Sequence, residues 1–323
     1  MQAVILAAGS GKRLGLLTQY RSKAMQPIVG KPMVERVIES FYLHDIHEFI
    51  IVIRPNDKSI RPHLEKNTSY DIKFTFVFQD QQLGMAHALK QASQVINNNF
   101  ILSACDNLIP LDDLNRFLTT WRNNKQYNGL LTLISLPDEM IPKSGIVELN
   151  GDNSIKRIVE KPSLDKAPSN IGSIPIYGFS KRILGYLDKI DISPRNEFEL
   201  QDAIQMMIED EGGVYGYHVS ERYTVTSPQD LLNVNRAYLR RNNELNILFD
   251  KELINLSTQF IPPIHIEPNV KIGKNCFIGP EVFIEKGCEI KDNVSIQSSV
   301  ILSGTKVEEN TIIKEKVLCP FCD

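Results

Sequence analysis

The hydrophobic positions of the first hundred residues form short apolar runs separated by amphipathic segments. Residues 3–8 and 49–53 are continuous apolar runs, typical of strands buried on both faces. Residues 72–78 alternate apolar and polar side chains, and residues 100–104 form a further strand-like run. The segments between them favour helices, which the chain predicts at residues 31–41, 57–66 and 84–96. This alternation predicts an α/β domain with a parallel sheet, whose ligands bind at the carboxyl ends of the strands.

Strand-like and helix-like hydrophobic patterns continue to residue 245. Residues 145–158 favour a pair of strands, and residues 197–210 and 227–245 carry apolar positions at helical spacing. Ser227 directly precedes Pro228, a residue that is tolerated in the first turn of a helix. We therefore expect Ser227 to cap the last of these helices.

The hydrophobic period changes after Pro262, where two rows of small apolar residues recur every six positions. The first row consists of Ile266, Ile272, Ile278, Ile284, Ile290 and Ile296, and the second of Val270, Cys276, Val282, Cys288, Val294 and Val300. Neither a helix nor a flat strand has this period. Hexapeptide repeats are the signature of a parallel β-helix, in which each short side turns one aliphatic residue inward. Cys276 and Cys288 are accordingly expected to be packing residues.

Composition excludes several classes of function. The 323 residues are 42% hydrophobic and 23% charged, as in globular proteins with more than one domain. The net charge of −3 gives no indication of binding to nucleic acid or to an anionic membrane. Because the apolar run after Met1 is too short for a signal peptide or a membrane span, we expect a cytoplasmic protein. Cys319 and Cys322 supply only two of the four ligands of a structural zinc, so we expect them to belong to a packed or solvated tail, with a metal or redox role shared between subunits as the alternative.

A glycine-rich turn follows the first strand, as in phosphate-binding loops. It does not fit a Walker A loop, since Leu6 and Arg13 stand where glycine and Ser or Thr are required. It does not fit a dinucleotide-binding loop either, since Leu14 replaces the third glycine.

The motif that does fit resembles the signature of the sugar-1-phosphate nucleotidylyltransferases. It reads L-A-A-G-x-G-x-R-L, followed by a lysine ahead of P-I-x-G-K-P, and comprises Leu6 to Gly9, Gly11, Arg13, Leu14, Lys23, Pro27, Ile28, Gly30, Lys31 and Pro32. Further motifs of the family follow in order as far as the hexapeptide repeat. The resemblance implies a Rossmann-like mixed α/β sheet of the nucleotidyltransferase type, followed by a short left-handed parallel β-helix. We expect a nucleotidyltransferase domain at residues 1–235, a helical linker at 236–262 and the β-helix domain at 263–323.

For the nucleotide, the resemblance implies a site built from Leu6, Ala8, Gly9, Gly11, Gln79 and Gly84. Glycine permits close approach of the backbone to phosphates, and Arg13 and Lys23 can offset the negative charge of a nucleoside triphosphate. Gln79 would read a pyrimidine edge, because an amide both donates and accepts hydrogen bonds. The sequence Gln82-Leu83-Gly84 is closest to the members that use UTP. In the family, Mg²⁺ is bound by the aspartate at the position of Asp106, although Cys105 replaces the usual glycine here.

For the sugar 1-phosphate, the resemblance implies Gly145, Glu160, Lys161, Asn170 and Glu199. Glu160 and Glu199 would contact sugar hydroxyls, and Lys161 would meet the sugar phosphate. A cation is needed there because two anionic phosphates must approach each other. The alternative for each of these charged residues is an ordinary solvated position at a strand end.

The implied reaction joins a nucleoside triphosphate, UTP or dTTP, to a sugar 1-phosphate and releases pyrophosphate. The sugar phosphate oxygen would attack the α-phosphorus in line, with Arg13, Lys23 and Lys161 as catalytic residues and Mg²⁺ as cofactor. Two departures weaken the resemblance: Thr224 replaces a second acidic metal ligand, and Pro175 replaces a small residue beside the sugar. They favour the alternative of a regulatory paralogue that binds a nucleotide-sugar without turning it over.

The β-helix raises a third interpretation, a bifunctional enzyme with acyltransferase activity in the tail. About three coils of about eighteen residues fit after Pro262, and His265 is the one histidine there. We instead expect the β-helix to mediate a homo-oligomer.

Overall fold

The computed structural model describes residues 1–66, 71–242, 245–247 and 257–321, and the chain divides into two compact units. The first unit comprises residues 1–10 and 34–223, and the second comprises residues 11–33 and 224–323.

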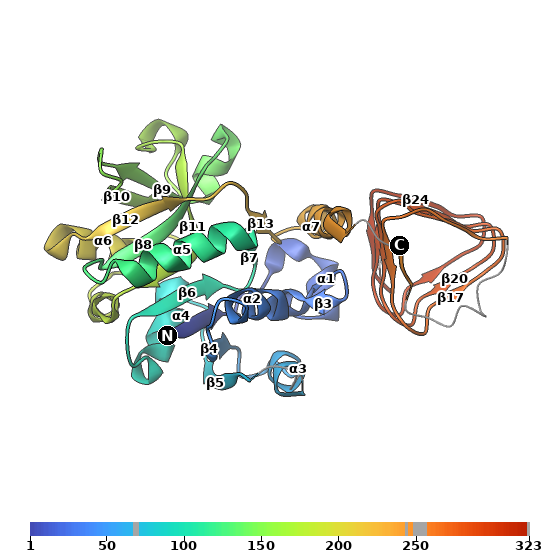
Figure 1. Cartoon of the computed structure of the whole chain (residues 1–323), viewed down its shortest axis with the longest axis horizontal. Coiled ribbons are helices and arrows are strands. Elements are labelled where there is room, and N and C mark those ends of the chain that lie inside the picture. Colours follow the sequence, from blue (N-terminus) through green and yellow to red (C-terminus); the bar gives the residue numbers. More distant parts are fainter. Residues whose placement is uncertain (67–70, 243–244, 248–256, 322–323) are drawn as a thin grey trace. The chain divides into compact units, whose positions relative to one another are not determined.

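The first unit is an α/β domain (Figure 1). Its strands are β1 (Gln2–Leu6), β4 (Glu48–Ile53), β5 (Lys73–Phe78), β6 (Phe100–Ala104), β7 (Asn107–Leu108), β8 (Gly129–Ser135), β9 (Gly145–Leu149), β10 (Ile155–Glu160), β11 (Ile171–Phe179) and β12 (Val214–His218), with β13 (Tyr223–Thr224) at its end. Its helices are α2 (Met33–Tyr42), α3 (Ile60–Lys66), α4 (Met85–Ala92), α5 (Leu111–Asn123) and α6 (Leu200–Glu211), with the 3-10 segments η3 (Ser93–Val95), η4 (Asp138–Lys143), η5 (Leu164–Lys166) and η6 (Lys181–Tyr186).

The central sheet is mixed, and among the described residues it has nine strands. Its main path runs β10-β9-β11-β6-β1-β4-β5, while β8 pairs with β11 and β12 pairs with β8. The strands β6, β1, β4 and β5 are parallel, as the apolar runs predict, and β11 is antiparallel to β6, β8 and β9. The predicted Rossmann-like mixed sheet is therefore confirmed.

Helices pack on this sheet because alternate residues of each buried strand face opposite sides. On one face of the sheet, Val4, Leu102 and Leu131 form a core with the apolar residues of α4 and α6. On β11, Gly178 makes room for α5, since a Cβ there would lie 2.5 Å from Cδ2 of Trp121. Helices thus bury the faces of the sheet, and the polar residues of the predicted site lie at the ends of its strands.

The second unit contains the β-helix together with short segments from both parts of the chain. It comprises η1 (Lys12–Leu14), α1 (Leu16–Tyr20), η2 (Lys23–Met25), β2 (Pro27–Ile28), β3 (Lys31–Pro32), α7 (Pro228–Asn242), β14 (Leu245–Ile247), β15 (Gln259–Phe260), β16 (Ile264–Ile266), β17 (Lys271–Ile272), β18 (Phe277–Ile278), β19 (Val282–Ile284), β20 (Glu289–Ile290), β21 (Ser295–Gln297), β22 (Val300–Ile301), β23 (Lys306–Val307), β24 (Ile312–Lys314) and β25 (Val317–Leu318).

The repeat folds into three parallel sheets, β14-β16-β19-β22-β25, β15-β18-β21-β24 and β17-β20-β23. Viewed end-on in orange to red, the coils form a triangle (Figure 1). The register pairs Ile264 with Val282 and Ile266 with Ile284, a shift of one eighteen-residue coil as predicted. This is the arrangement of a left-handed β-helix, so the second part of the fold prediction is confirmed.

The two predicted rows fill the interior of the β-helix. All of their members except the half-buried Ile272 are buried. Cys276 and Cys288 pack among them, and burial raises the pKa of the Cys288 thiol to about 12. Both cysteines are thus packing residues, as expected.

The predicted start of the helix at residue 227 is also confirmed. The Asp230 backbone N–H donates to Ser227 Oγ at 3.2 Å, and the Ser227 backbone N–H donates to Asp230 Oδ2 at 2.9 Å. Such a reciprocal cap satisfies backbone donors at the start of α7. The end of the predicted helix at residues 243–244, part of the predicted linker, and Cys322 lie outside the described residues. The predicted domain boundaries stay a prediction.

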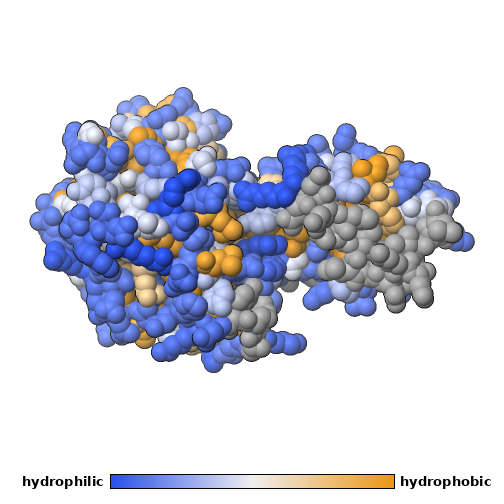
Figure 2. Space-filling model, in the orientation of Figure 1, coloured by the Kyte–Doolittle hydropathy of each residue, from blue (hydrophilic) through white to orange (hydrophobic). Residues whose placement is uncertain are grey.

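The surface of the α/β unit in view is mostly hydrophilic, with small hydrophobic groups between the polar residues (Figure 2). Within the described residues, none of the helices has the length and apolar character that crossing a membrane requires.

Candidate active site

Three predicted site segments follow parallel strands at the same edge of the sheet. Leu6, at the end of β1, pairs with Val52 of β4 and with Ala104 of β6. Ala8 is buried, while Gly9 is exposed, and a Cβ at Gly9 would meet no described atom within 4 Å. Parallel strands bring their carboxyl ends to one edge, so the loops after β1, β5 and β6 lie together there.

Gln79 and Gly84 are brought together by the turn after β5. The Gln79 backbone N–H donates to Ile53 O at 2.9 Å, which extends the pairing of β5 with β4 by one residue. The buried Gln79 side chain donates through Nε2 to Gly84 O at 3.2 Å, and Nε2 lies 3.1 Å from His87 Nδ1. Burial lowers the pKa of His87, which favours its neutral form beside this amide.

Gly84 has a backbone conformation that is nearly exclusive to glycine, with φ 96° and ψ 178°. A Cβ there would lie 2.6 Å from the carbonyl oxygen of Phe198. Phe198 in turn donates its N–H to Leu83 O at 2.7 Å. Since Glu199 is the next residue, the predicted base-reading turn is in direct contact with one predicted sugar-side segment.

Asp106 lies in the tight turn between β6 and β7 and is half-buried. Asn107 donates through Nδ2 to Asp106 Oδ1 at 2.9 Å, which fixes the carboxylate at the strand end. Among the described residues, no group of three or more His, Cys, Asp or Glu is arranged to hold a metal. A single carboxylate suits Mg²⁺, which takes most of its ligands from phosphates and water.

Glu160, among the predicted sugar-side residues, has a buried carboxylate next to a lysine. Its side chain is 8% exposed, and Lys161 Nζ lies 3.0 Å from Glu160 Oε1. Burial raises the pKa of Glu160 in spite of the lysine. Glu160 Oε2 is buried without a hydrogen-bond partner in the described structure. Lys161 itself has a left-handed φ of 46°, the kind of local strain that often accompanies a functional site.

Gly145 opposes Glu160 across the β9–β10 pair and is surrounded by polar atoms. A Cβ at Gly145 would lie 2.9 Å from Ser173 Oγ, 3.1 Å from Gln201 Nε2 and 3.1 Å from Glu160 Oε2. Gln201 Oε1 is a second buried acceptor without a partner in the described structure. Strand β10 and helix α6 thus bring two side chains with unsatisfied acceptors, Glu160 and Gln201, beside the Gly145 backbone.

Glu199 is the N-cap residue of α6 and is held by two donors from the preceding loop. Ser193 Oγ donates to Glu199 Oε1 at 2.8 Å, and Arg195 Nη2 lies 2.9 Å from the same oxygen.

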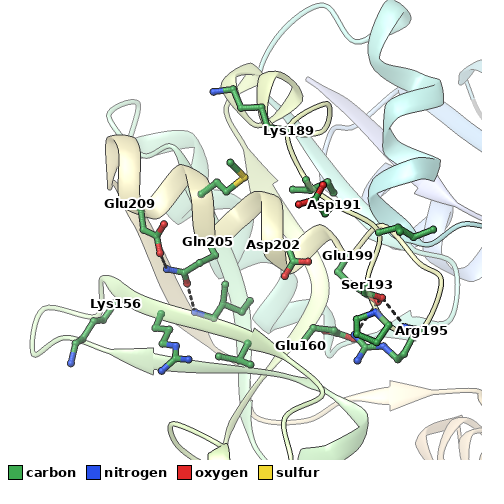
Figure 3. A pocket seen from close by; sticks show the side chains of 17 residues that line it. Lys156, Glu160, Lys189, Asp191, Ser193, Arg195, Glu199, Asp202, Gln205 and Glu209 are labelled. Atoms are coloured by element: carbon green, nitrogen blue, oxygen red, sulfur yellow. Dashed lines mark hydrogen bonds and ion pairs between the residues drawn. The ribbon is translucent and has the colours of Figure 1, made fainter.

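A polar cleft of about 940 Å³ joins Glu160 and Glu199 between β10, α6 and the loop before it. Figure 3 shows Glu160, Ser193, Arg195 and Glu199 grouped at one end of this cleft, with Lys156 and Glu209 at the other. Asn170 is exposed ahead of β11, and the residues that line the cleft do not include it.

The second unit holds Gly11, Arg13 and Lys23. Gly11 has a left-handed φ of 66°, and a Cβ there would lie 2.9 Å from Lys23 Cβ. The lysine side chain therefore starts next to the glycine turn, although Lys23 lies twelve positions after Gly11 in the sequence. Lys23 is half-buried, whereas Arg13 is exposed in η1.

The two sequence departures have different surroundings. Pro175 lies where the register of β11 against β8 shifts between Ile174 and Tyr177. At this irregularity a residue without an N–H is tolerated, and Thr132 Oγ1 bonds the flanking carbonyl oxygens of Ile174 and Ile176 at 2.9 and 3.0 Å. Thr224 lies in β13, and its hydroxyl is buried without a hydrogen-bond partner in the described structure.

Ser173, Ser193, Arg195 and Gln201 were not identified from the sequence. Arg195 stands four residues before Glu199, a spacing that could have suggested an ion pair. The other three carry no sequence signal, because they approach the site only through the packing of β11, α6 and the loop ahead of α6.

Comparisons with known proteins identify the family of this chain. Residues 2–241 match the family described as Nucleotidyl transferase, and residues 260–322 match the GMPPB C-terminal domain. The chain is 30% identical over 242 residues to the Bifunctional protein GlmU of Methanococcus maripaludis strain S2, covering 75% of this chain and 55% of that protein. It is 30% identical over 284 residues to a bifunctional sugar-1-phosphate nucleotidylyltransferase/acetyltransferase of Sulfurisphaera tokodaii, covering 84% of this chain and 60% of the relative. The chain therefore spans little more than half the length of these curated relatives.

The fold recurs in a solved UDP-glucose pyrophosphorylase complexed with UDP-glucose. The TM-score is 0.66 at 24% sequence identity, over 74% of this chain and 98% of that chain. Because the family match spans most of the chain and the fold agrees with it, the chain belongs to the nucleotidyl transferase family.

Proposed function

We propose that the chain is a sugar-1-phosphate nucleotidylyltransferase, which joins UTP or dTTP to a sugar 1-phosphate and releases pyrophosphate. The observation that carries the proposal is the ion pair between the buried carboxylate of Glu160, which lines a polar cleft, and the half-buried Lys161. A buried carboxylate with one unsatisfied oxygen calls for a hydroxyl donor, since an unpaired buried acceptor costs about 1–3 kcal/mol. The adjacent ammonium supplies the countercharge that a phosphate needs. A sugar 1-phosphate combines both groups in one small molecule.

On the sugar side, Glu160 and Glu199 accept hydrogen bonds from sugar hydroxyls and the Gly145 backbone lies beside them. Lys161 binds the sugar phosphate, and Asn170 lies at the rim. The buried amide of Gln201 offers a further acceptor. Arg195 holds the Glu199 carboxylate in position through an ion pair of 2.9 Å.

On the nucleotide side, the backbone at Leu6, Ala8, Gly9 and Gly11 forms the phosphate-binding turn. Gln79 reads the pyrimidine edge, and Gly84 fixes its amide through the bond from Nε2. That bond uses one amide proton and leaves the carbonyl oxygen to accept from N3–H of uracil or thymine. The preference for UTP or dTTP follows from this pairing.

In the reaction, an oxygen of the sugar phosphate attacks the α-phosphorus and the bond to pyrophosphate breaks. Arg13 and Lys23 act on the triphosphate and Lys161 on the attacking phosphate, so the three cations offset the repulsion between the two anions. Asp106 is the residue that would hold Mg²⁺, and the bound ion would neutralise phosphate charge. No covalent enzyme intermediate is needed.

Release of pyrophosphate tests this proposal. Purified protein is incubated with Mg²⁺, each of several nucleoside triphosphates and a panel of sugar 1-phosphates. We expect release with UTP or dTTP that requires the sugar phosphate. Lys23→Ala and Asp106→Ala should lower turnover by orders of magnitude, whereas Lys12→Ala, which removes an exposed lysine next to Gly11, should not. Turnover near the wild-type rate in both variants would contradict the assignment.

A regulatory paralogue is the second candidate, favoured by Thr224 and Pro175. It predicts that a nucleotide-sugar binds tightly while pyrophosphate is never released. The same panel combined with calorimetric titration of nucleotide-sugars separates the two functions.

Acyltransfer by the tail is the third candidate, and the name of the Sulfurisphaera relative favours it. His265 is half-buried, with its ring centroid 5.7 Å from that of Phe283. A cytoplasmic homo-oligomer assembled through the β-helix remains part of the proposal, and light scattering of full-length protein tests the assembly.

A further inference from the structure

The segment of residues 11–33, which carries Gly11 and Lys23, groups with α7 and the β-helix in one compact unit. Because this segment follows strand β1, the sheet alone could have supported it. Here much of its support comes from the C-terminal repeat, hundreds of residues away in sequence.

An ion pair joins this segment to the β-helix. Arg21 Nη1 donates to Glu285 Oε1 at 2.7 Å, and Nη2 donates to Glu285 Oε2 at 2.9 Å. The side chains are 18% and 7% exposed, so this bidentate pair is largely shielded from water. Glu285 Oε2 also accepts the Ser303 backbone N–H at 2.8 Å, which fixes the carboxylate to the next coil. A bidentate guanidinium–carboxylate pair sets orientation as well as distance.

A second group of contacts holds the end of the segment. The fully buried Asn235 of α7 accepts the Val29 N–H at 2.8 Å and donates to Pro27 O at 3.0 Å. Gly30 lies against β16 and the turn after it, where a Cβ would be 3.1 Å from His265 Nε2 and 3.2 Å from Glu267 Oε1.

Within the segment, Gln26 connects these anchors to Lys23. The buried Gln26 side chain donates to Leu17 O at 3.0 Å and to Arg21 O at 3.3 Å. The Gln26 backbone N–H donates to Lys23 O at 3.1 Å. Lys23 therefore stands between two fixed points, with Arg21 before it and Gln26 after it.

We propose that Arg21 and Glu285 are positioning residues for Lys23, so that the β-helix holds the catalytic lysine in place. This inference rests on the proposed function and adds a role for the C-terminal domain in catalysis within one chain. Neither residue touches substrate; their effect passes through the backbone of residues 21–26.

The test compares Arg21→Ala and Glu285→Gln with a matched control, Arg240→Ala. Arg240 also pairs with a β-helix carboxylate, Glu281, which keeps Arg236 as a partner at 2.7 Å. Within the described part of the chain, Arg240 forms no hydrogen bond or ion pair with residues 11–33, so the loss of its side chain reports a general weakening of the β-helix contact with α7. Glu285→Gln keeps the size of the side chain and an oxygen for the Ser303 N–H.

We expect kcat to fall about 10- to 100-fold in both test variants, since small misplacements of a catalytic group have effects of this size. The KM for the sugar 1-phosphate should change little, because Glu160 and Lys161 lie in the other unit. Arg240→Ala should keep the wild-type kcat. The charge-swapped double variant, Arg21→Glu with Glu285→Arg, should recover part of the lost rate.

A second measurement needs no activity. Hydrogen exchange of the peptide covering residues 11–33 should be faster in Arg21→Ala and Glu285→Gln than in the wild type and in Arg240→Ala. Unchanged exchange, or a kcat loss no greater than that of Arg240→Ala, would overturn the inference. If wild-type protein releases no pyrophosphate from any substrate pair, the proposed function fails, and exchange alone decides whether the β-helix holds the segment.

Discussion

Replacing Gly84 by alanine would strain the turn where α4 begins. The backbone at φ 96° and ψ 178° is open almost only to glycine, and a side chain there costs about 1–3 kcal/mol. The added Cβ would also lie 2.6 Å from Phe198 O and 3.0 Å from Phe198 N. Phe198 O accepts a hydrogen bond from the Ala86 N–H, and the Phe198 N–H donates to Leu83 O. Displacing that backbone weakens two hydrogen bonds of about 0.5–1.5 kcal/mol each. The expected loss of unfolding free energy is therefore about 2–6 kcal/mol.

Thermal unfolding followed by circular dichroism measures this loss. For a unit of this size, about 1 kcal/mol shifts Tm by about 2–4 °C, so we expect Tm to fall by at least about 4 °C. Gly185→Ala is the control, because a Cβ there would meet no described atom within 4 Å. Since Glu199 follows Phe198, Gly84→Ala should also raise the KM for the sugar 1-phosphate as well as that for the nucleotide. A Tm equal to that of Gly185→Ala would refute the contact between Gly84 and Phe198.

Two further substitutions test buried polar groups. Burial raises the pKa of Glu160 above its ordinary value of 4.5, so its stabilising contribution is complete below that pH and is lost as pH rises through the folded-state pKa. In urea unfolding, Glu160→Gln should therefore become more stable relative to the wild type between pH 4.5 and pH 8. The variant should also bind the sugar 1-phosphate more weakly. A difference in unfolding free energy that does not change with pH would contradict this prediction. Asn235→Ala should cost about 1–3 kcal/mol in urea unfolding, because it leaves the buried Val29 N–H without its acceptor. The exposed neighbouring variant Asn233→Ala should be near neutral, and equal losses in the two would argue against the buried bond.

The fold could be predicted where one physical rule acts over a short stretch. Burial on both faces marks β1 and β4 as apolar runs, and the six-residue period marks the β-helix, because each coil side turns one residue inward. The mixed character of the sheet is less visible, since antiparallel pairing of β11 with β6, β8 and β9 leaves no pattern in the sequence of β11 alone.

The residues of the candidate site could be predicted only through the motifs, and the contacts that support them could not be predicted. Arg21 and Glu285 are 264 positions apart, and nothing in either local sequence indicates their pairing. Pro175 is a departure in the sequence, yet the structure places it at a shift in register where the sheet tolerates it. Gly84 was expected to read a base, and its contact with Phe198 emerges only when the turn after β5 is placed against the start of α6.

In the proposed function, cationic groups of this chain let two phosphates react with each other. Phosphorus-31 NMR of protein, Mg²⁺, UTP or dTTP and a sugar 1-phosphate observes every phosphorus at once. We expect equal growth of the nucleoside diphosphate-sugar and pyrophosphate signals as the sugar phosphate signal declines, and we expect no such reaction in Lys161→Ala. Persistence of all starting signals across the substrate panel, or triphosphate hydrolysis with the sugar phosphate unconsumed, would contradict it.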